Sequence, residues 1–74
     1  MTARQLRARL LKHRGHVVAP VIGPEGLQVQ TRVVKSDLTD YLLALSDRGK
    51  GEEEAPWDVM YVSDRQEMVL GVRS

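Results

Sequence analysis

The last eighteen residues constrain the fold most, because two short alternating segments flank a polar turn there. The turn is predicted at residues 63–66, and the register that it sets brings large side chains together on one face of a hairpin. These side chains are Trp57, Val59, Tyr61, Met68, Leu70 and Val72. The opposite face is mixed in polarity. The pattern therefore predicts an antiparallel hairpin over residues 57–73 with one wholly apolar, buried face.

A second hairpin is predicted upstream. Residues 16–22 are rich in Val and Ile, and residues 27–34 alternate between apolar and polar side chains. Between them, Gly23-Pro24-Glu25-Gly26 has the proline and glycines that a tight turn requires. Pro20 has no N–H to donate to a strand ladder, which predicts that the first strand lies at a sheet edge or a bulge.

A basic helix is predicted at the start of the chain. Residues 2–14 have high helix propensity, with Thr2 as a cap and Gly15 where a left-handed residue ends a helix. Its apolar stripe is narrow and consists mainly of Ala3, Leu6 and Leu10.

A second helix is predicted at residues 37–45. Ser36 is a suitable N-cap, and apolar side chains recur at helical spacing at Leu38, Tyr41, Leu42 and Leu45. Residues 46–56 contain glycines, a proline and a block of charge without an apolar period. We expect this segment to be a mobile loop.

Together these elements predict a small α+β fold in the order α-β-β-α-β-β. Residues 1–74 form one domain, in which two helices cover one side of an antiparallel sheet made of the two hairpins. The chain has no cysteine, so packing or association must hold it together, which is typical of a cytoplasmic protein. No apolar run is long enough for an export signal or a membrane span, so we expect no membrane partner.

Charge is unevenly distributed along the chain. The first sixteen residues hold five bases and no acid, whereas residues 36–74 hold nine carboxylates against four bases. A formal net charge of +1 therefore hides a dipolar molecule. Such an asymmetry carries information about binding partners rather than about the fold.

The basic helix is the predicted partner-binding element, through Arg4, Arg7, Lys12 and Arg14. Arginine is favoured in protein interfaces, and a pI of about 8.2 lies below that of a typical nucleic-acid-binding domain. We therefore expect a small non-enzymatic binding module, a regulator or inhibitor that docks on an acidic surface of a larger protein or complex. Its small size is typical of viral or mobile-element accessory factors.

Two alternatives to this function remain open. A DNA- or RNA-binding accessory protein would use the same helix on phosphates. A homodimer would complete its core through an exposed strand edge or through the narrow-striped first helix.

The sequence predicts no catalytic residue, no metal site and no cofactor. His13 and His16 have a ligand-like spacing, but Gly15 separates them and no cysteine is present to complete a zinc site. Three hairpin carboxylates, Asp58, Asp64 and Glu67, lack the convergent lysine or histidine of a nuclease centre. Other notable groups have plainer interpretations: Trp57 and Tyr61 as core residues, and Glu52-Glu53-Glu54 as a solvated loop.

By element order alone, residues 2–45 resemble small double-stranded-RNA-binding folds, which also begin with a basic helix followed by strands and a second helix. Those folds carry three strands between their helices, whereas two are predicted in this chain. The resemblance therefore assigns no functional residue.

Overall fold

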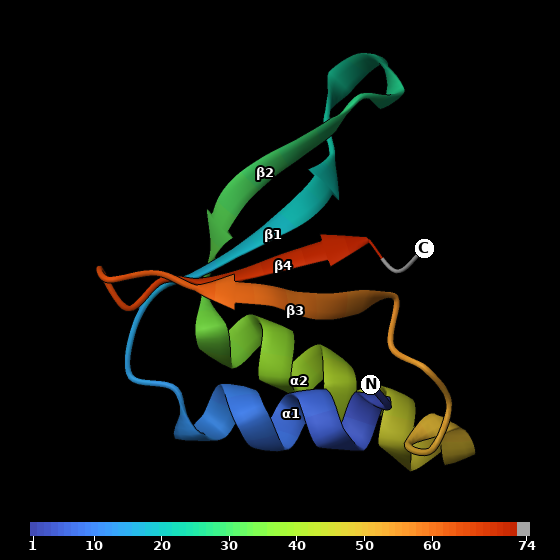
Figure 1. The fold of residues 1–74 in the computed structure, drawn as a ribbon. Coiled ribbons are helices and arrows are strands. Elements are labelled where there is room, and N and C mark those ends of the chain that lie inside the picture. The colour runs from blue at the N-terminus through green and yellow to red at the C-terminus, as the bar shows by residue number, and fades with distance from the viewer. Residues whose placement is uncertain (73–74) are drawn as a thin grey trace.

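The computed structural model describes residues 1–72, in which two helices cover one face of a four-stranded sheet (Figure 1). The elements are α1 (Ala3–Lys12), β1 (Val17–Ile22), β2 (Gln28–Val33), α2 (Lys35–Leu45), β3 (Trp57–Val62) and β4 (Met68–Val72). A short turn, Pro24–Gly26, joins β1 to β2, and a wide helical turn, Ser46–Lys50, continues α2. The predicted α+β class and element order are confirmed, while position 73 of the predicted hairpin lies outside the described residues.

None of the helices in residues 1–72 has the length and apolar character needed to span a membrane.

The sheet is mixed, with strand order β2-β1-β4-β3. Both hairpins are antiparallel as predicted, but β1 pairs with β4 in parallel, through Val17 with Met68 and Val18 with Val69. The expectation of a wholly antiparallel sheet is therefore wrong. The reason is that α2 returns the chain to the end of the sheet from which β2 started, so β3 runs in the same direction as β2 (Figure 1).

The parallel ladder stops at Pro20. The N–H of Met68 donates to the carbonyl of His16 at 2.9 Å. In a strand, the backbone groups of alternate residues point to the same neighbour, so those of His16, Val18 and Pro20 point toward β4. Pro20 has no N–H, so the ladder has no donor at this position. From there β1 and β2 diverge from β4 as a projecting arm (Figure 1). A cleft of about 390 Å³ opens between the arm and the start of β3, lined by Pro20, Val21, Ile22, Pro56, Trp57 and Val72. However, β1 lies between β2 and β4 and its pairing has no bulge, so the prediction that this strand lies at a sheet edge or a bulge is wrong. Pro20 is accommodated because its ladder with β4 has already ended at Val18.

The core lies between the helices and the sheet. Leu6 and Leu10 of α1 and Leu42 of α2 are fully buried against Val17 and Leu70 of the central strands. Burying a side chain of this size stabilises the fold by about 1.5–3 kcal/mol. The narrow stripe of α1 is sufficient because α1 packs on both the sheet and α2.

A bulge in β3 moves Tyr61 to the other face of the sheet. Trp57 pairs with Val72 and Val59 with Leu70 as predicted, but the register then shifts and Tyr61 pairs with Val69. An extra residue in one strand moves the following side chain to the other face. Tyr61 therefore lies on the helix-free face, 56% exposed, and its predicted place in the apolar core is wrong.

The ends of the helices differ in part from the prediction. Thr2 caps α1: its side-chain oxygen accepts a hydrogen bond from the Gln5 N–H, and its own N–H donates to the Gln5 side chain. Helix α2 begins earlier than predicted, after Val34 rather than Ser36. The Lys35 ammonium reaches back and donates to the carbonyls of Leu11 at 3.4 Å and His13 at 2.6 Å, satisfying the C-terminal end of α1.

Gly15 does not end α1 in a left-handed conformation, because α1 ends at Lys12 and Gly15 is not among the residues with positive φ. A Cβ at position 15 would lie 1.7 Å from the carbonyl oxygen of Gln66 in the β3–β4 turn. The glycine is therefore required for the close approach of two backbones.

We expect Gly15→Ala to lower the free energy of unfolding by about 2 kcal/mol or more, since the new methyl group meets backbone that must move. Gly71→Ala is the matched control. Its Cβ meets the side chain of Met60, which is largely exposed and can rotate away, so a loss below about 1 kcal/mol is expected. Urea denaturation of both variants measures the difference, and equal losses would contradict this role of Gly15.

Candidate functional site

The structure divides the bases of α1 into two groups. In the N-terminal half, Arg4 forms an exposed ion pair with Glu52, and the Nε of Arg7 donates to the carbonyl of Thr39 on α2 at 3.3 Å. Two of the four predicted partner-binding residues are therefore already engaged within the chain. Lys12 and Arg14, the other two, are exposed at the opposite end of α1.

The acidic segment lies against the start of α1. The carbonyls of Glu53 and Gly51 accept hydrogen bonds from the N–H groups of Ala3 and Arg4, both at 3.0 Å. These N–H groups belong to the first turn, which has no partners inside the helix. Carboxylates are also favoured at the positive end of the helix dipole. Residues 51–55 therefore cap α1, and the predicted mobility of residues 46–56 stays a prediction.

The Met1 amino group belongs to the same arrangement. It donates to the carboxylates of Glu54 and Asp58, the second at 3.1 Å. The hydrogen bond that it donates to Glu54, followed by the one that it donates to Asp58, raises the pKa of this amino group above its ordinary value of 8.0. The carboxylates thus favour the charged amine.

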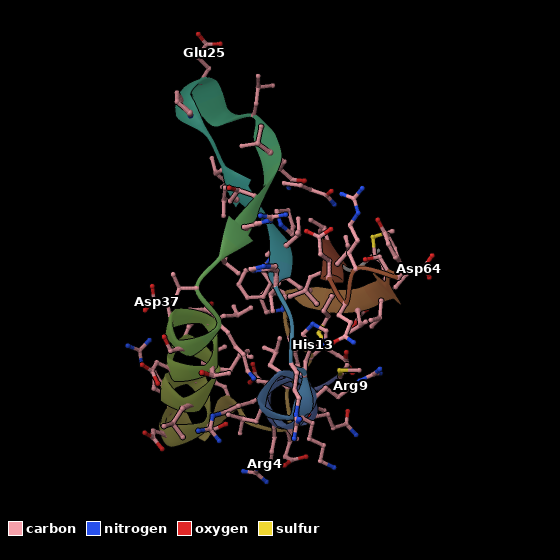
Figure 2. The ribbon with its side chains drawn as sticks, turned by 90° about the vertical axis from the view of Figure 1, so that its left-hand side faces the viewer. Arg4, Arg9, His13, Glu25, Asp37 and Asp64 are labelled. Carbon is pink, nitrogen blue, oxygen red and sulfur yellow. The ribbon has the colours of Figure 1, made fainter. Side chains whose placement is uncertain are left out.

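The C-terminal half of α1 borders a shallow hollow of about 260 Å³, which we call the basic hollow. It is lined by Arg9, Lys12, His13, Val62 and Met68. Met68 forms a nearly buried floor, whereas Val62 on β3 is about half exposed. Figure 2 shows Arg9 and His13 on the side of α1 that faces the β3–β4 turn, where Asp64 lies.

The cations that line this hollow are available to a ligand. None of the ion pairs formed between residues 1–72 involves Arg9 or Lys12, or Arg14, which follows the end of α1. Exposed guanidinium and ammonium groups beside an apolar floor suit a ligand that presents carboxylates around an apolar side chain. The basic hollow is therefore the candidate binding site.

Arg9 was not among the predicted site residues. The prediction followed the stripe of Arg4, Arg7 and Arg14, whose first two members turn out to bind within the chain. The spacing of residues 9, 12 and 13 is also that of neighbours on a helix surface. That spacing was the signal by which Arg9 could have been found.

The remaining candidates are not brought together. Asp58 binds the Met1 amine, Glu67 binds Arg32 at 3.1 Å, and Asp64 lies in the turn between β3 and β4. Within residues 1–72, no group of three or more His, Asp or Glu side chains is close enough to hold a metal ion.

The two aromatic residues of β3 lie on opposite faces of the sheet. Trp57 packs on the core, with its ring centroid 5.7 Å from that of Tyr41, while Tyr61 lies on the helix-free face. They therefore form no joint stacking platform.

Comparison with known protein families, with curated proteins and with solved structures finds no match to this chain. The functional proposal therefore depends on the geometry of the chain's own residues.

The raised pKa of the Met1 amine predicts a pH dependence. A charged group with a raised pKa in the folded state stabilises the fold fully below its ordinary pKa, and this contribution disappears as the pH rises through the folded-state value. In a protein whose first residue is Met1, we expect the denaturation midpoint to fall as the pH rises above 8.0. Glu54→Gln combined with Asp58→Asn should reduce this fall, and an identical fall in that variant would contradict the assignment.

Proposed function

We propose that this protein is a small non-enzymatic binding module, a regulator or inhibitor, which docks through the C-terminal half of α1 on an acidic surface of a larger protein or complex. The observation that supports the proposal is the basic hollow, where cations without an ion-pair partner in residues 1–72 surround an apolar floor. We place this activity in the cytoplasm, where a cysteine-free domain needs no oxidising compartment.

The chain's own acidic segment supports this placement of the site. Glu52 pairs with Arg4, and Glu54 and Asp58 pair with the Met1 amine, so negative charge collects at the N-terminal end of α1. At the other end, Arg9, Lys12 and Arg14 are exposed and form no ion pair within residues 1–72. A dipolar surface of this kind attracts an acidic partner and sets its orientation during encounter.

The partner's surface is defined by what would complement the hollow. Arg9 can hold a carboxylate through two parallel hydrogen bonds, and Lys12 can bind a second carboxylate. An apolar side chain between the two would cover Val62 and contact Met68. Binding would act by occupation, since the docked domain excludes other ligands from the acidic surface.

A nucleic acid is the competing partner, because phosphates would meet the same bases. The apolar floor favours a protein, since a phosphate backbone gains nothing from covering Val62. The two differ in salt dependence: affinity for DNA or RNA falls steeply with salt, in proportion to the number of phosphates contacted.

The test is a nuclease-treated pull-down that compares three forms of the chain. The first is the parent, the second carries Arg9→Glu, Lys12→Glu and Arg14→Glu, and the third carries charge reversals at exposed residues away from the hollow. The control substitutions are Arg48→Glu and Lys50→Glu, in the wide helical turn after α2. We expect the parent and the control to recover the same acidic protein, and the Arg9/Lys12/Arg14 variant to bind it at least about 10-fold more weakly.

The purified parent is also titrated with mixed-sequence duplex DNA and single-stranded RNA. Recovery of the same proteins by all three forms would contradict the site. Loss of every partner on nuclease treatment, with tight binding of DNA or RNA at low salt, would replace the acidic protein with a nucleic acid.

A further inference from the structure

The two edges of the sheet are protected very differently. Exposed edge strands invite pairing with another chain, and natural proteins block them with lysine, proline, inward charges or bulges. Edge strand β3 has such devices: Pro56 before it, Asp58 within it and the register shift after Val59. The other edge, β2, is regularly paired along its whole length, contains neither lysine nor proline, and is exposed at every residue except Val33.

Alternate residues of β2 present free backbone groups. The N–H of Gly23 donates to the carbonyl of Leu27 at 2.6 Å, so Leu27, Val29 and Thr31 belong to the set that bonds to β1. The N–H and carbonyl groups of Gln28, Gln30 and Arg32 therefore point away from β1, at the edge of the sheet. These three residues form a template for one more antiparallel strand.

The arm formed by the distal parts of β1 and β2 is apolar as well as unpaired. It projects beyond the helices (Figure 1), and it exposes Val21, Ile22, Leu27 and Val29, with Ile22 at 77%. The accessible surface of the chain, 5190 Å², exceeds by about 600 Å² the value typical of a compact monomer of 8.3 kDa. Two copies that buried this excess would remove about 1,200 Å² from water, the lower bound for a specific interface.

A matching hollow lies where β2 meets α2. It has a volume of about 340 Å³ and is lined by Val33, Val34, Asp37, Leu38 and Tyr41. Val34 and Tyr41 are substantially exposed, although both are large and mostly apolar. We call this site the α2 hollow. It lies at the end of the same strand whose other end carries the exposed Leu27.

We propose that two copies of this chain pair antiparallel through their β2 edges, about a two-fold axis at Gln30. In this register Gln30 lies opposite its own counterpart, and Gln28 lies opposite Arg32. Leu27 of each copy falls opposite Val33 of the other and enters its α2 hollow. One register thus satisfies the free backbone groups and covers both apolar surfaces, and the two sheets join into one.

The charges on β2 permit this pairing. Arg32 is its only charged residue and already binds Glu67 at 3.1 Å. The two Arg32 residues would stand about 14 Å apart along the joined strands, beyond the screening length at physiological salt.

The proposed interface is separate from the basic hollow. Figure 2 shows the arm tip at Glu25 and the α1 residue Arg4 at opposite ends of the molecule. Asp37 on α2 and Arg9 on α1 lie on opposite sides in the same view. Dimerisation through β2 therefore leaves the basic hollow open to its partner.

Because the chain has no cysteine, a disulfide can test the register directly. The hydrogen-bonded pair at the axis has a Cα separation of about 5.5 Å, which lies in the range that a disulfide spans. We expect Gln30→Cys to form a covalent dimer on mild oxidation. Gln28→Cys is the control: alone it should not cross-link, because its two copies are about 14 Å apart, but mixed with Arg32→Cys it should.

Sedimentation equilibrium over a concentration series tests the same interface without a cross-link. We expect the parent to be in a monomer–dimer equilibrium and Gln30→Pro, which removes an outward N–H that β1 does not use, to weaken association at least about 10-fold. Gln30→Thr retains the N–H and should dimerise like the parent. Leu27→Lys leaves the backbone unchanged and should also weaken association. If the circular dichroism signal shows that Gln30→Pro disturbs the fold, Leu27→Lys replaces it in this test.

A parent that stays monomeric up to millimolar concentration would overturn the proposal. This would hold even if a strand of another protein were found to pair with the β2 edge. Dimerisation that both Gln30→Pro and Leu27→Lys leave unchanged would also overturn it, because the contact would then lie on another face. The Arg9→Glu, Lys12→Glu, Arg14→Glu variant should dimerise like the parent, so failure of the acidic-partner proposal is distinguishable from failure of this one.

Discussion

The structure depends on a parallel ladder of only two residue pairs between β1 and β4, which joins the two hairpins into one sheet. The ladder forms because α2 sets the direction of the second hairpin, and because Gly15 lets the chain pass close to the β3–β4 turn. It ends at Pro20, which has no hydrogen to donate. Beyond this missing donor the arm separates from β4, and the cleft beside Trp57 lies between them.

The electrostatics of the molecule follow from the way in which its two halves fold together. The basic first helix and the acidic segment are distant in sequence, yet the segment supplies both the carbonyls that cap α1 and the carboxylates beside its first residues. Exposed ion pairs such as Arg4 with Glu52 contribute little to stability, typically less than about 1 kcal/mol. Their main effect is to place carboxylates beside the cations at the start of α1, whereas Arg9, Lys12 and Arg14 form no ion pair within residues 1–72.

Features specified by neighbouring residues were predictable from the sequence, and those specified by distant ones were not. Thr2 caps α1 through a residue three positions away, and both hairpins follow from local alternation and turn residues. The parallel pairing depends on the crossover, the position of Tyr61 on a one-residue bulge, and the engagement of Arg4 and Arg7 on partners far along the chain. The predicted basic helix therefore exists, but contacts invisible in the sequence select which of its cations are free.

Trp57 is the only tryptophan of the chain, and it lies where three parts of the molecule meet. Its partly buried ring packs on the core, contacts Tyr41 of α2 and lines the cleft that the arm leaves open. Indole emission depends on the polarity around the ring, and a nearby tyrosine transfers excitation to it. The protein therefore contains an optical reporter at the junction of the arm, the sheet and α2. Movement of the arm relative to α2 would change a signal from one residue in the unlabelled protein.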